Sequence, residues 1–482
     1  MTTTGAMRPR SFTPIECAVA VHLVVFFVGV SWAFGGNADW VRTPISIWGS
    51  IGICLTGVIA TRQMGRRDNL RGPLAWIWPI AVLNALVFVS ALTPGFRVLT
   101  SGSGPLMMPL SIAWWKPSSA RADVTLRSLW LFDGIYFSCI NIALAVRHRR
   151  VIRSVLAILV GNALVLAVFG TVQKLVGATG IYFGAVKSPQ TLFFASFVYD
   201  NHWGAFIVLM LGACTGLIIE YAHGRNGEGF FRGPGFFGTV AGVLMAISVP
   251  LSGSRACTLL LCILSGVALV RGIPEILRAL RNSGIKPAIA SAGLTIAAIL
   301  AAAGAWEVAG GVIQDRANKT REQVATMWAQ GGIGSRSVLY HDTWRMAQPR
   351  LLFGWGMGSF PIVFRLFNTQ ENKVDRIPIV YHDAHSDWLQ SVAELGLVGT
   401  SLIGVAVALP ALAARRSRVT ALPFFLLCGC ALTAIYAWIE FPFGNVAVVL
   451  GWWLCFIGAV QYVRLTDPPP KPPAQAGSRN PS

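Results

Sequence analysis

Residues 16–36 have the sequence ECAVAVHLVVFFVGVSWAFGG, in which Glu16 is the only Asp, Glu, Lys or Arg. An apolar stretch of this length, coiled as a helix, crosses the roughly 30 Å hydrocarbon core of a bilayer. It begins later than a secretory signal usually does, and no small-residue cleavage site followed by a soluble domain comes after it. We therefore expect it to be retained as a membrane span.

Apolar stretches of the same kind recur as far as Val463, and 54% of all residues are hydrophobic whereas 12% are charged. This composition is typical of proteins embedded in a bilayer. The sequence therefore predicts an all-α polytopic membrane protein with about 12 transmembrane helices. The predicted spans are 16–36, 45–61, 73–93, 129–146, 155–177, 203–221, 236–251, 256–271, 288–308, 395–414, 421–439 and 446–463.

The net charge is +19, but its distribution argues against nucleic acid as a partner. Basic residues gather in alternate loops, which the positive-inside rule places in the cytoplasm together with both termini. The loop 94–128 also carries basic residues, and we assign it to the outer side because the neighbouring loops require it. The basic residues of the predicted cytoplasmic loops are Arg8, Arg10, Arg62, Arg66, Arg67, Arg71, Arg147, Arg149, Arg150, Arg153, Arg271, Arg278, Arg281, Lys286, Arg415, Arg416 and Arg418.

The segment 309–394 is the longest interruption of the apolar pattern, and it falls on the outer side. We expect residues 1–308 to hold transmembrane helices 1–9 and residues 309–394 to form a large periplasmic loop. Residues 395–465 should hold helices 10–12, and the proline-rich residues 466–482 should be a disordered cytoplasmic tail.

The long loop itself is predicted to contain helices. One should run from Ser335, which can cap it, to Ala347, because Pro349 follows. A second should start at Asp383 and continue into the tenth span. The part between them, 353–381, is rich in glycine and proline, so it should consist of turns packed on the membrane surface.

Arg255 is the first candidate for a functional residue. It ends the sequence SGSR at 252–255, a turn between the seventh and eighth predicted spans that is too short to leave the bilayer boundary. Two interpretations remain open. The side chain extends to lipid head groups, or it faces an internal cavity and binds an anion through paired guanidinium hydrogen bonds. Arginine is scarce on short outer turns, which favours the second.

The long loop adds further candidates. Arg336 and Arg345 lie in its first predicted helix, although charged loop residues are most often simply solvated. His385 lies at the start of the helix that becomes the tenth span, which fixes its imidazole at the membrane surface. Since free histidine titrates near neutral pH, His385 is a candidate general base.

Two more segments reach the same face of the membrane. Asn201 and His202 lie at the outer end of the sixth span, where helix capping by Asp200 or Asn201 is the competing structural explanation. Glu440 follows the eleventh span, where its carboxylate is placed to pair with one of the arginines.

The sequence predicts neither a metal nor a cofactor. All nine cysteines fall in apolar spans, which indicates a role in packing. No His or Cys cluster has the spacing of zinc ligands. The glycine-rich residues 354–358, GWGMG, lack a preceding strand and a suitably placed lysine, which excludes a nucleotide-binding loop.

Three segments together resemble the superfamily of bacterial O-antigen ligases and polymerases, and the likeness covers most of the chain. They are the turn 252–256 (SGSRA), the loop residues Ser335, Arg336, Trp344, Pro349 and 354–360 (GWGMGSF), and the segment 384–390 (AHSDWLQ) followed by 394–399 (ELGLVG). Residues 200–202 (DNH) and 440–442 (EFP) also resemble family landmarks. Serine at 386 and glutamate at 440 depart from the commoner asparagine and aspartate.

The resemblance implies a GT-C-like fold in the bacterial inner membrane. Members take a glycan from an undecaprenyl-diphosphate carrier in the membrane lipid and pass it to an acceptor hydroxyl on the periplasmic face, without a metal or a nucleotide sugar. It implies that Arg255 and Arg336 neutralise the leaving diphosphate and that His385 activates the acceptor hydroxyl, with inversion at the anomeric carbon. The residues expected to bind substrate are Arg345, Asn201, His202 and Glu440.

The leading hypothesis is a ligase that joins O-antigen or a similar polymer to a lipid A core. A polymerase that extends the growing glycan on its carrier would use the same donor site, and the sequence does not separate the two. A protein oligosaccharyltransferase and a glycan transporter or flippase are further alternatives. The transporter is less favoured because ionisable residues gather at the outer surface instead of the bilayer midplane.

Overall fold

The computed structural model describes residues 12–63, 71–101, 104–110, 112–223, 234–282, 335–370, 379–414 and 419–465. Within these residues, 10 helices are long and apolar enough to cross a membrane, and Ala421–Tyr436 is a shorter apolar helix. They confirm the all-α polytopic membrane class. Every predicted span except 288–308 corresponds to one of these helices. The span 288–308, loop residues 309–334 and the tail 466–482 lie outside the described residues.

The chain forms its elements in the following order. The first half contains α1 (Pro14–Trp32), α2 (Asp39–Gln63), α3 (Arg71–Ala75), α4 (Trp78–Leu92), β1 (Phe96–Ser101), β2 (Gly104–Pro109), α5 (Ala122–Ala145), α6 (Arg149–Leu175) and α7 (Asp200–His223). The second half contains α8 (Pro234–Ser252), α9 (Arg255–Asn282), α11 (Ser335–Ala347), α12 (Phe360–Val363), α13 (Asp387–Ala414), α14 (Ala421–Tyr436) and α15 (Val446–Arg464). The helix predicted from Ser335 to Ala347 is therefore confirmed as α11.

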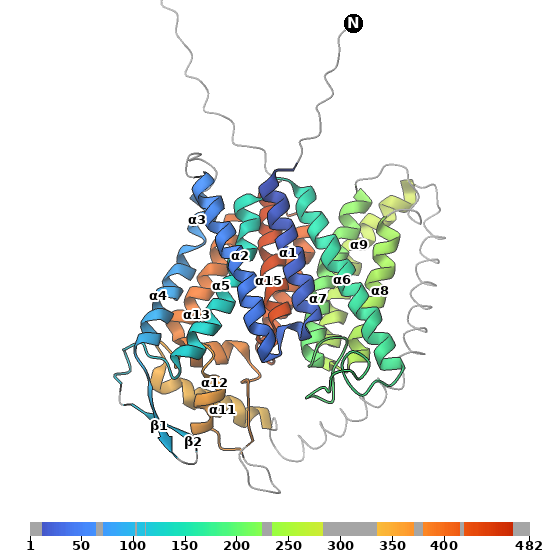
Figure 1. The fold of residues 1–482 in the computed structure, drawn as a ribbon. Coiled ribbons are helices and arrows are strands. Elements are labelled where there is room, and N and C mark those ends of the chain that lie inside the picture. The colour runs from blue at the N-terminus through green and yellow to red at the C-terminus, as the bar shows by residue number, and fades with distance from the viewer. Residues whose placement is uncertain are drawn as a thin grey trace, which may run out of the picture.

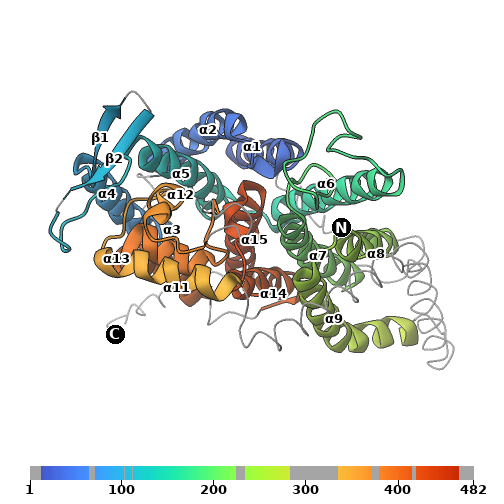
Figure 2. The same ribbon diagram turned by 90° about the horizontal axis from the view of Figure 1, so that it is seen from below.

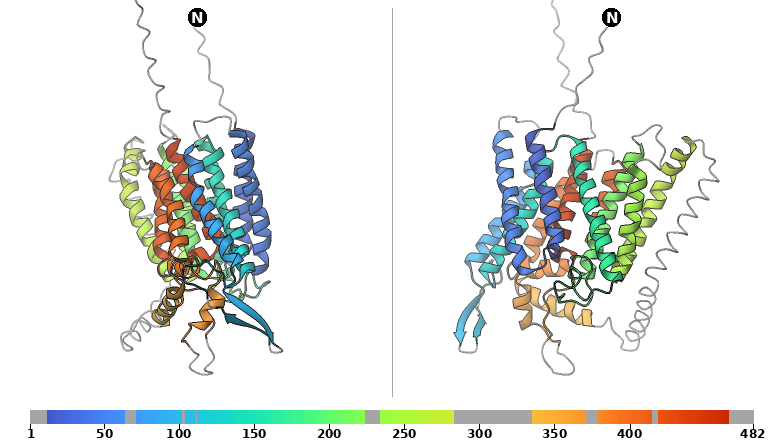
Figure 3. Two further views of the ribbon diagram at one scale, coloured as in Figure 1. Left: turned by 90° about the vertical axis from the view of Figure 1, so that its left-hand side faces the viewer. Right: turned by 45° about the vertical axis from the view of Figure 1, so that its right-hand side comes forward.

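The long helices form one bundle and alternate in direction along the chain (Figure 1). α15 lies near its middle, between α5, α7 and α14 (Figure 2), and 94% of the residues in its apolar stretch are buried. α11, α12 and the β1–β2 hairpin lie together below the bundle in Figures 1 and 3, and we call this the loop end. The loop 94–128 is thus at the same end as the long loop, as predicted.

Small residues let α2 and α5 approach closely. A Cβ atom on Gly49 would lie 2.7 Å from the Cα of Gly134, and one on Gly52 would lie 2.1 Å from the Ser138 hydroxyl. Close backbone approach of this kind drives helix association in membranes, where burial of apolar surface gives little advantage. His22 of α1 adds a hydrogen bond of 2.9 Å to Ser138, which ties a third helix to this pair.

A break in α13 determines how the long loop is attached. Gly396 has φ 67° and ψ −177°, which is not helical. Because the helix is interrupted there, the amides of Leu397 and Val398 donate to the carbonyls of Leu351 and Leu352, at 2.8 and 3.1 Å. Loop backbone thus replaces part of the hydrogen bonding of the helix, and all these polar groups stay satisfied.

Glu394, just before the break, binds the glycine-rich segment 354–358. Its carbonyl accepts from the amide of Gly356 at 2.8 Å, and its carboxylate accepts from the amides of Gly358 and Phe360 at 2.7 and 3.0 Å. A Cβ on Gly354, whose φ is +69°, would lie 2.2 Å from the Glu394 carbonyl oxygen. These glycines therefore serve close packing on α13.

The antiparallel pair β1–β2 is a feature that the sequence analysis missed. Phe96 pairs with Pro109 at one end of the hairpin. Beside it, the amide of Ala120 donates to the carbonyl of Trp355 at 2.7 Å, which joins the loop 94–128 to the long loop. The available signal was SGSG at 101–104 between two apolar runs, a pattern typical of a hairpin.

We predict that Gly396→Ala destabilises the protein by at least about 2 kcal/mol. The new Cβ would lie 2.3 Å from the Leu352 carbonyl oxygen on a backbone with φ +67°. The measurement is thermal denaturation of the purified protein in detergent. Gly404→Ala in the same helix is the control, because nothing lies within 4 Å of its Cβ position. Equal melting temperatures for both variants would show that the break is not a structural requirement.

Candidate active site

Glu440 lies at the centre of a cluster at the loop end. It belongs to the turn between α14 and α15, and 2% of its surface is exposed. Its Oε1 atom accepts from the Arg336 guanidinium and from Asn201 Nδ2, the latter at 3.1 Å. Its Oε2 atom lies 3.2 Å from His385 Nδ1. Both carboxylate oxygens are therefore paired, which a buried charge requires.

Arg336 reaches the cluster from the first turn of α11. Besides Glu440, it binds the Ile439 carbonyl at 3.0 Å, and 44% of its side chain is exposed. Burial lowers the pKa of Arg336, but the Glu440 carboxylate outweighs this effect and raises the pKa above its usual value. The guanidinium thus carries a permanent charge with one side held by protein and the other open to solvent.

His385 is held in an unusual backbone conformation. Its φ is 51°, in the left-handed region that a residue with a Cβ rarely adopts. The Tyr340 hydroxyl donates to the His385 carbonyl at 2.8 Å, and the imidazole packs edge-on against Phe441, with ring centroids 4.7 Å apart. Strain of this kind persists only when the surroundings fix it, and it is common at functional sites.

The hydrogen bond to Glu440 determines the tautomer of His385. A carboxylate can only accept, so in the neutral imidazole Nδ1 carries the proton and Nε2 holds the lone pair. Among the described residues, no hydrogen bond to Nε2 is found, and 26% of the side chain is exposed. A neutral imidazole in this arrangement can accept a proton at Nε2, and the imidazolium that results lies beside a carboxylate.

Asn201 connects the cluster to the turn before α9. The Ser254 hydroxyl donates to Asn201 Oδ1, while Asn201 Nδ2 is 2.9 Å from the Tyr199 hydroxyl. Burial and the nearby charges of Glu440 and Asp200 raise the pKa of Tyr199, which keeps its hydroxyl neutral. Asn201 therefore positions the turn that carries Arg255 against the cluster.

Arg255 is the first residue of α9 and directly follows Ser254. The tight turn predicted between the seventh and eighth spans is present, and Gly253 adopts φ 99° in it. The Arg255 side chain is partly exposed. The free backbone amides of the first turn of α9 point out of its N-terminus, where the helix dipole favours anions. Arg255 adds a full positive charge at this end of the helix.

His202 and Arg345 occupy different surroundings. His202 is buried behind the cluster, where Nε2 is 3.1 Å from the Phe441 carbonyl and Nδ1 is 3.4 Å from Asn37 Nδ2. Arg345 comes nine residues after Arg336 on α11, which at 3.6 residues per turn places it on the opposite side. It lies 3.9 Å from Asp342 and half of its side chain is exposed.

The structure thus brings five predicted site residues into one network or directly beside it, namely Arg255, Arg336, His385, Asn201 and Glu440. The sequence analysis gave no role to Tyr340, which orients the His385 backbone. Its spacing of four from Arg336 was the available signal, because residues four apart share one face of a helix. Within the described ranges, no group of three or more His, Cys, Asp or Glu is arranged to hold a metal.

The fold and the site together define a polytopic helical membrane protein with a cationic, histidine-containing site at one end of its bundle. Residues 240–404 match the family model described as O-antigen ligase. This match confirms the resemblance of that part of the chain to the O-antigen ligase and polymerase superfamily, since the segments 252–256, 335–360 and 384–399 all lie within it. Asn201 and Glu440 lie outside the matched residues. No curated protein matches the chain.

We predict that Arg336→Ala lowers the free energy of unfolding by about 2 to 4 kcal/mol, because it leaves the buried Glu440 carboxylate without its cation. Arg345→Ala, on the same helix, should cost less than about 1 kcal/mol. Arg345 is half exposed and 3.9 Å from Asp342, and the buried Asp342 carboxylate keeps its hydrogen bonds from Thr369. Chemical denaturation of the purified variants measures both.

The double variant Arg336→Ala/Glu440→Gln is the decisive control for this ion pair. Removing both charges should recover part of the lost stability, because no buried charge is then unpaired. Strictly additive losses would mean that the two side chains do not interact in the folded protein.

Proposed function

We propose that the protein is a glycosyltransferase that moves a glycan from an undecaprenyl-diphosphate carrier to an acceptor hydroxyl. The observation that carries this proposal is the His385 imidazole, bound through Nδ1 to Glu440. The same carboxylate binds the guanidinium of Arg336 and, through Asn201, is linked to Ser254 in the turn that ends in Arg255. The family match supports transfer chemistry of this general type.

The reaction we propose is a single displacement. His385 Nε2 removes the proton from the acceptor hydroxyl, and the acceptor oxygen attacks the anomeric carbon of the donor. The bond from that carbon to the diphosphate oxygen breaks, and its electron pair leaves on the diphosphate. Because attack and departure occur on opposite faces of the sugar, the configuration inverts.

Arg255 and Arg336 stabilise the negative charge that develops on the diphosphate. Guanidinium groups form paired hydrogen bonds with phosphate oxygens, and they remain charged at every physiological pH. The stabilisation increases as the glycosidic bond breaks, which lowers the barrier and not only the free energy of the bound donor. The proposed mechanism requires no metal.

Glu440 is a positioning residue in this proposal and not a direct substrate ligand, because both of its oxygens are already paired with protein groups. It fixes the tautomer of His385 and stabilises the imidazolium that forms when the proton is taken. Asn201 and His202 support the same region from α7. A contact of Arg345 with substrate stays a prediction.

We propose that the loop end faces the periplasm from a bacterial inner membrane and that both termini are cytoplasmic. Arg149 at the start of α6 and Arg464 at the end of α15 lie at the other end of the bundle, where the positive-inside rule favours basic residues. A lipid-linked donor can then enter sideways from the bilayer. The network lies at the end of the bundle and not in its middle, which favours a transferase over a transporter.

The acceptor we propose is a lipid A core, which makes the protein an O-antigen ligase. We predict that a strain without this protein lacks polymer on lipid A while polymer accumulates on its lipid carrier. Electrophoresis of lipopolysaccharide and mass spectrometry of carrier-linked glycans measure the two pools. Single repeat units on lipid A would instead identify a polymerase, and unchanged glycans on both would exclude either activity.

We predict that His385→Ala and Arg255→Ala each reduce transfer by at least about a hundredfold while leaving folding and membrane insertion intact. The measurement is glycan transfer from carrier to acceptor by purified protein in detergent, where a pure transporter has no activity. The control variants are His341→Ala and Arg365→Ala, which remove exposed side chains of the same types at the same end. Full activity in either test variant would disprove the mechanism.

A further inference from the structure

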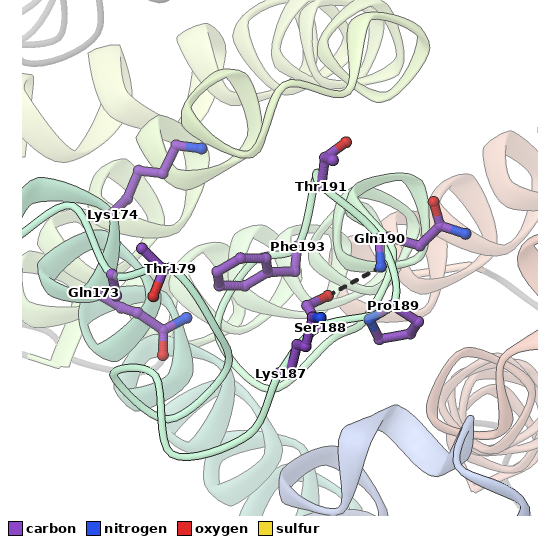
Figure 4. Close-up of a pocket in the computed structure, with 11 residues that line it drawn as sticks. Gln173, Lys174, Thr179, Lys187, Ser188, Pro189, Gln190, Thr191 and Phe193 are labelled. Carbon is purple, nitrogen blue, oxygen red and sulfur yellow. Dashed lines mark hydrogen bonds between the residues drawn. The ribbon is translucent and has the colours of Figure 1, made fainter.

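A second feature of the loop end is a cavity of about 390 Å³ beside the segment that follows α6 (Figure 4). The last turn of α6, with Gln173 and Lys174, forms one wall. The segment 187–191 forms the other, and the Phe193 ring lies between the two. None of these residues belongs to the network around Glu440.

The cavity is held open by a structured loop. Gln173, of which 2% is exposed, accepts from the amide of Phe183 at 3.1 Å and donates to the carbonyl of Ala195 at 3.2 Å. Tyr182, Phe183 and Ala195 have φ values of 54°, 59° and 52°, so three side-chain-bearing residues adopt the left-handed conformation. Three such residues persist only where the surrounding contacts fix the backbone conformation, and backbone strain of this kind is typical of functional sites.

The lining has the chemistry of a site for an anionic sugar. The two charged residues that line the cavity are both lysines, Lys174 and Lys187. Thr179, Ser188 and Gln190 add hydroxyl and amide groups for sugar hydroxyls, and Phe193 adds an apolar ring surface. The sequence from 170 to 199 contains no acidic residue, so no carboxylate of this segment neutralises the ammonium groups.

The surroundings of the cavity favour a sugar that is attached to lipid. Leu175 and Val176, which follow Lys174, are 61% and 64% exposed, and Phe183 and Val186 are 50% and 38% exposed. Because α6 is a membrane span, its end lies at the level of the lipid head groups. A cationic cavity flanked by exposed apolar side chains matches a glycolipid with an anionic head group.

The cavity and α11, which carries the proposed catalytic residue Arg336, lie on different sides of the bundle. Seen from the loop end, the segment after α6 covers the side of α1 and α6, whereas α11 lies on the far side of α15 (Figure 2). The chain runs from Phe193 directly to Asn201 of the network, and the amide of Asp200 donates to the Leu192 carbonyl at 3.2 Å. A ligand in the cavity is therefore close to the network without occupying it.

We propose that Lys174 and Lys187 bind the phosphate or carboxylate groups of a glycolipid head group in this cavity. The inference rests on the proposed transferase function, because that reaction requires two lipid-borne sugars to meet at one site. The same chemistry is present in a phosphorylated acceptor and in an acidic donor glycan, and the experiment separates these sources.

The experiment measures equilibrium binding to the purified full chain in nanodiscs, without transfer. The probes are lipid A core with its phosphates, the same glycolipid after dephosphorylation, and the undecaprenyl-diphosphate-linked glycan. Lys174→Gln/Lys187→Gln should weaken binding of the phosphorylated acceptor by at least about tenfold, since hydrogen bonds to charged groups are lost. Lys116→Gln, which removes an exposed lysine elsewhere at the loop end, should bind like wild type.

Each outcome supports or overturns the proposal. Weaker binding of the phosphorylated acceptor, with equal binding of its dephosphorylated form, identifies the acceptor as the ligand. If only binding of the undecaprenyl-diphosphate-linked donor weakens, the cavity is upheld as a site for the acidic donor glycan. Unchanged binding of both overturns it. Because binding is measured without turnover, loss of binding in a protein that shows no transfer would uphold the cavity and refute the proposed function.

Discussion

The buried carboxylate of Glu440 is the constraint on which the site depends. A carboxylate removed from water must find partners for both oxygens, and here the partners come from three separate regions of the chain. Arg336 comes from α11, His385 from the segment before α13, and Asn201 from the first turn of α7. Moving Arg336 away would leave the buried carboxylate without its cation, so this ion pair holds the long loop against the bundle.

A second constraint acts on the other side of His385. The start of α13 is fixed to the turn that carries Glu440, because the amide of Asp387 donates to the Ala437 carbonyl at 2.9 Å and the Asp387 carboxylate accepts from the amide of Phe443 at 2.8 Å. Farther along α13, the break at Gly396 anchors the loop backbone. His385 thus lies two residues from a helix that is tied down twice, which explains how its strained backbone is maintained.

Much of this arrangement could be predicted from the sequence, and the rest depends on geometry that composition does not record. Hydropathy and the alternation of basic loops determined the spans, because a bilayer demands long apolar helices. The segments around Arg255, Arg336 and His385 were also placed at one end. The pairing of Glu440 with both Arg336 and His385 was not predictable in detail, since it depends on how a short turn between two helices is oriented.

Other features escaped prediction for the same physical reason. The break at Gly396 leaves an apolar pattern that continues without interruption, so hydropathy shows one helix where the backbone has two. Arg336 and Arg345 were expected in the same helix, and in α11 they lie on opposite sides. Gln173 looks like an ordinary polar residue at a helix end, and only the fold shows that it spans two strained backbone positions.

The location of both polar sites follows from the physical state of the proposed substrates. Two sugars that are each anchored in lipid diffuse in the plane of the membrane, so they can meet only at head-group level. The proposed base, His385, lies beside the rigid start of a helix at this level. A substrate bound next to such a fixed base has already lost most of its orientational freedom before the reaction begins. Separate entry sides, one beside α6 and one beside α11, would let the first substrate stay bound while the second arrives. The helical bundle then serves to align the approaches of two substrates at one surface of the bilayer.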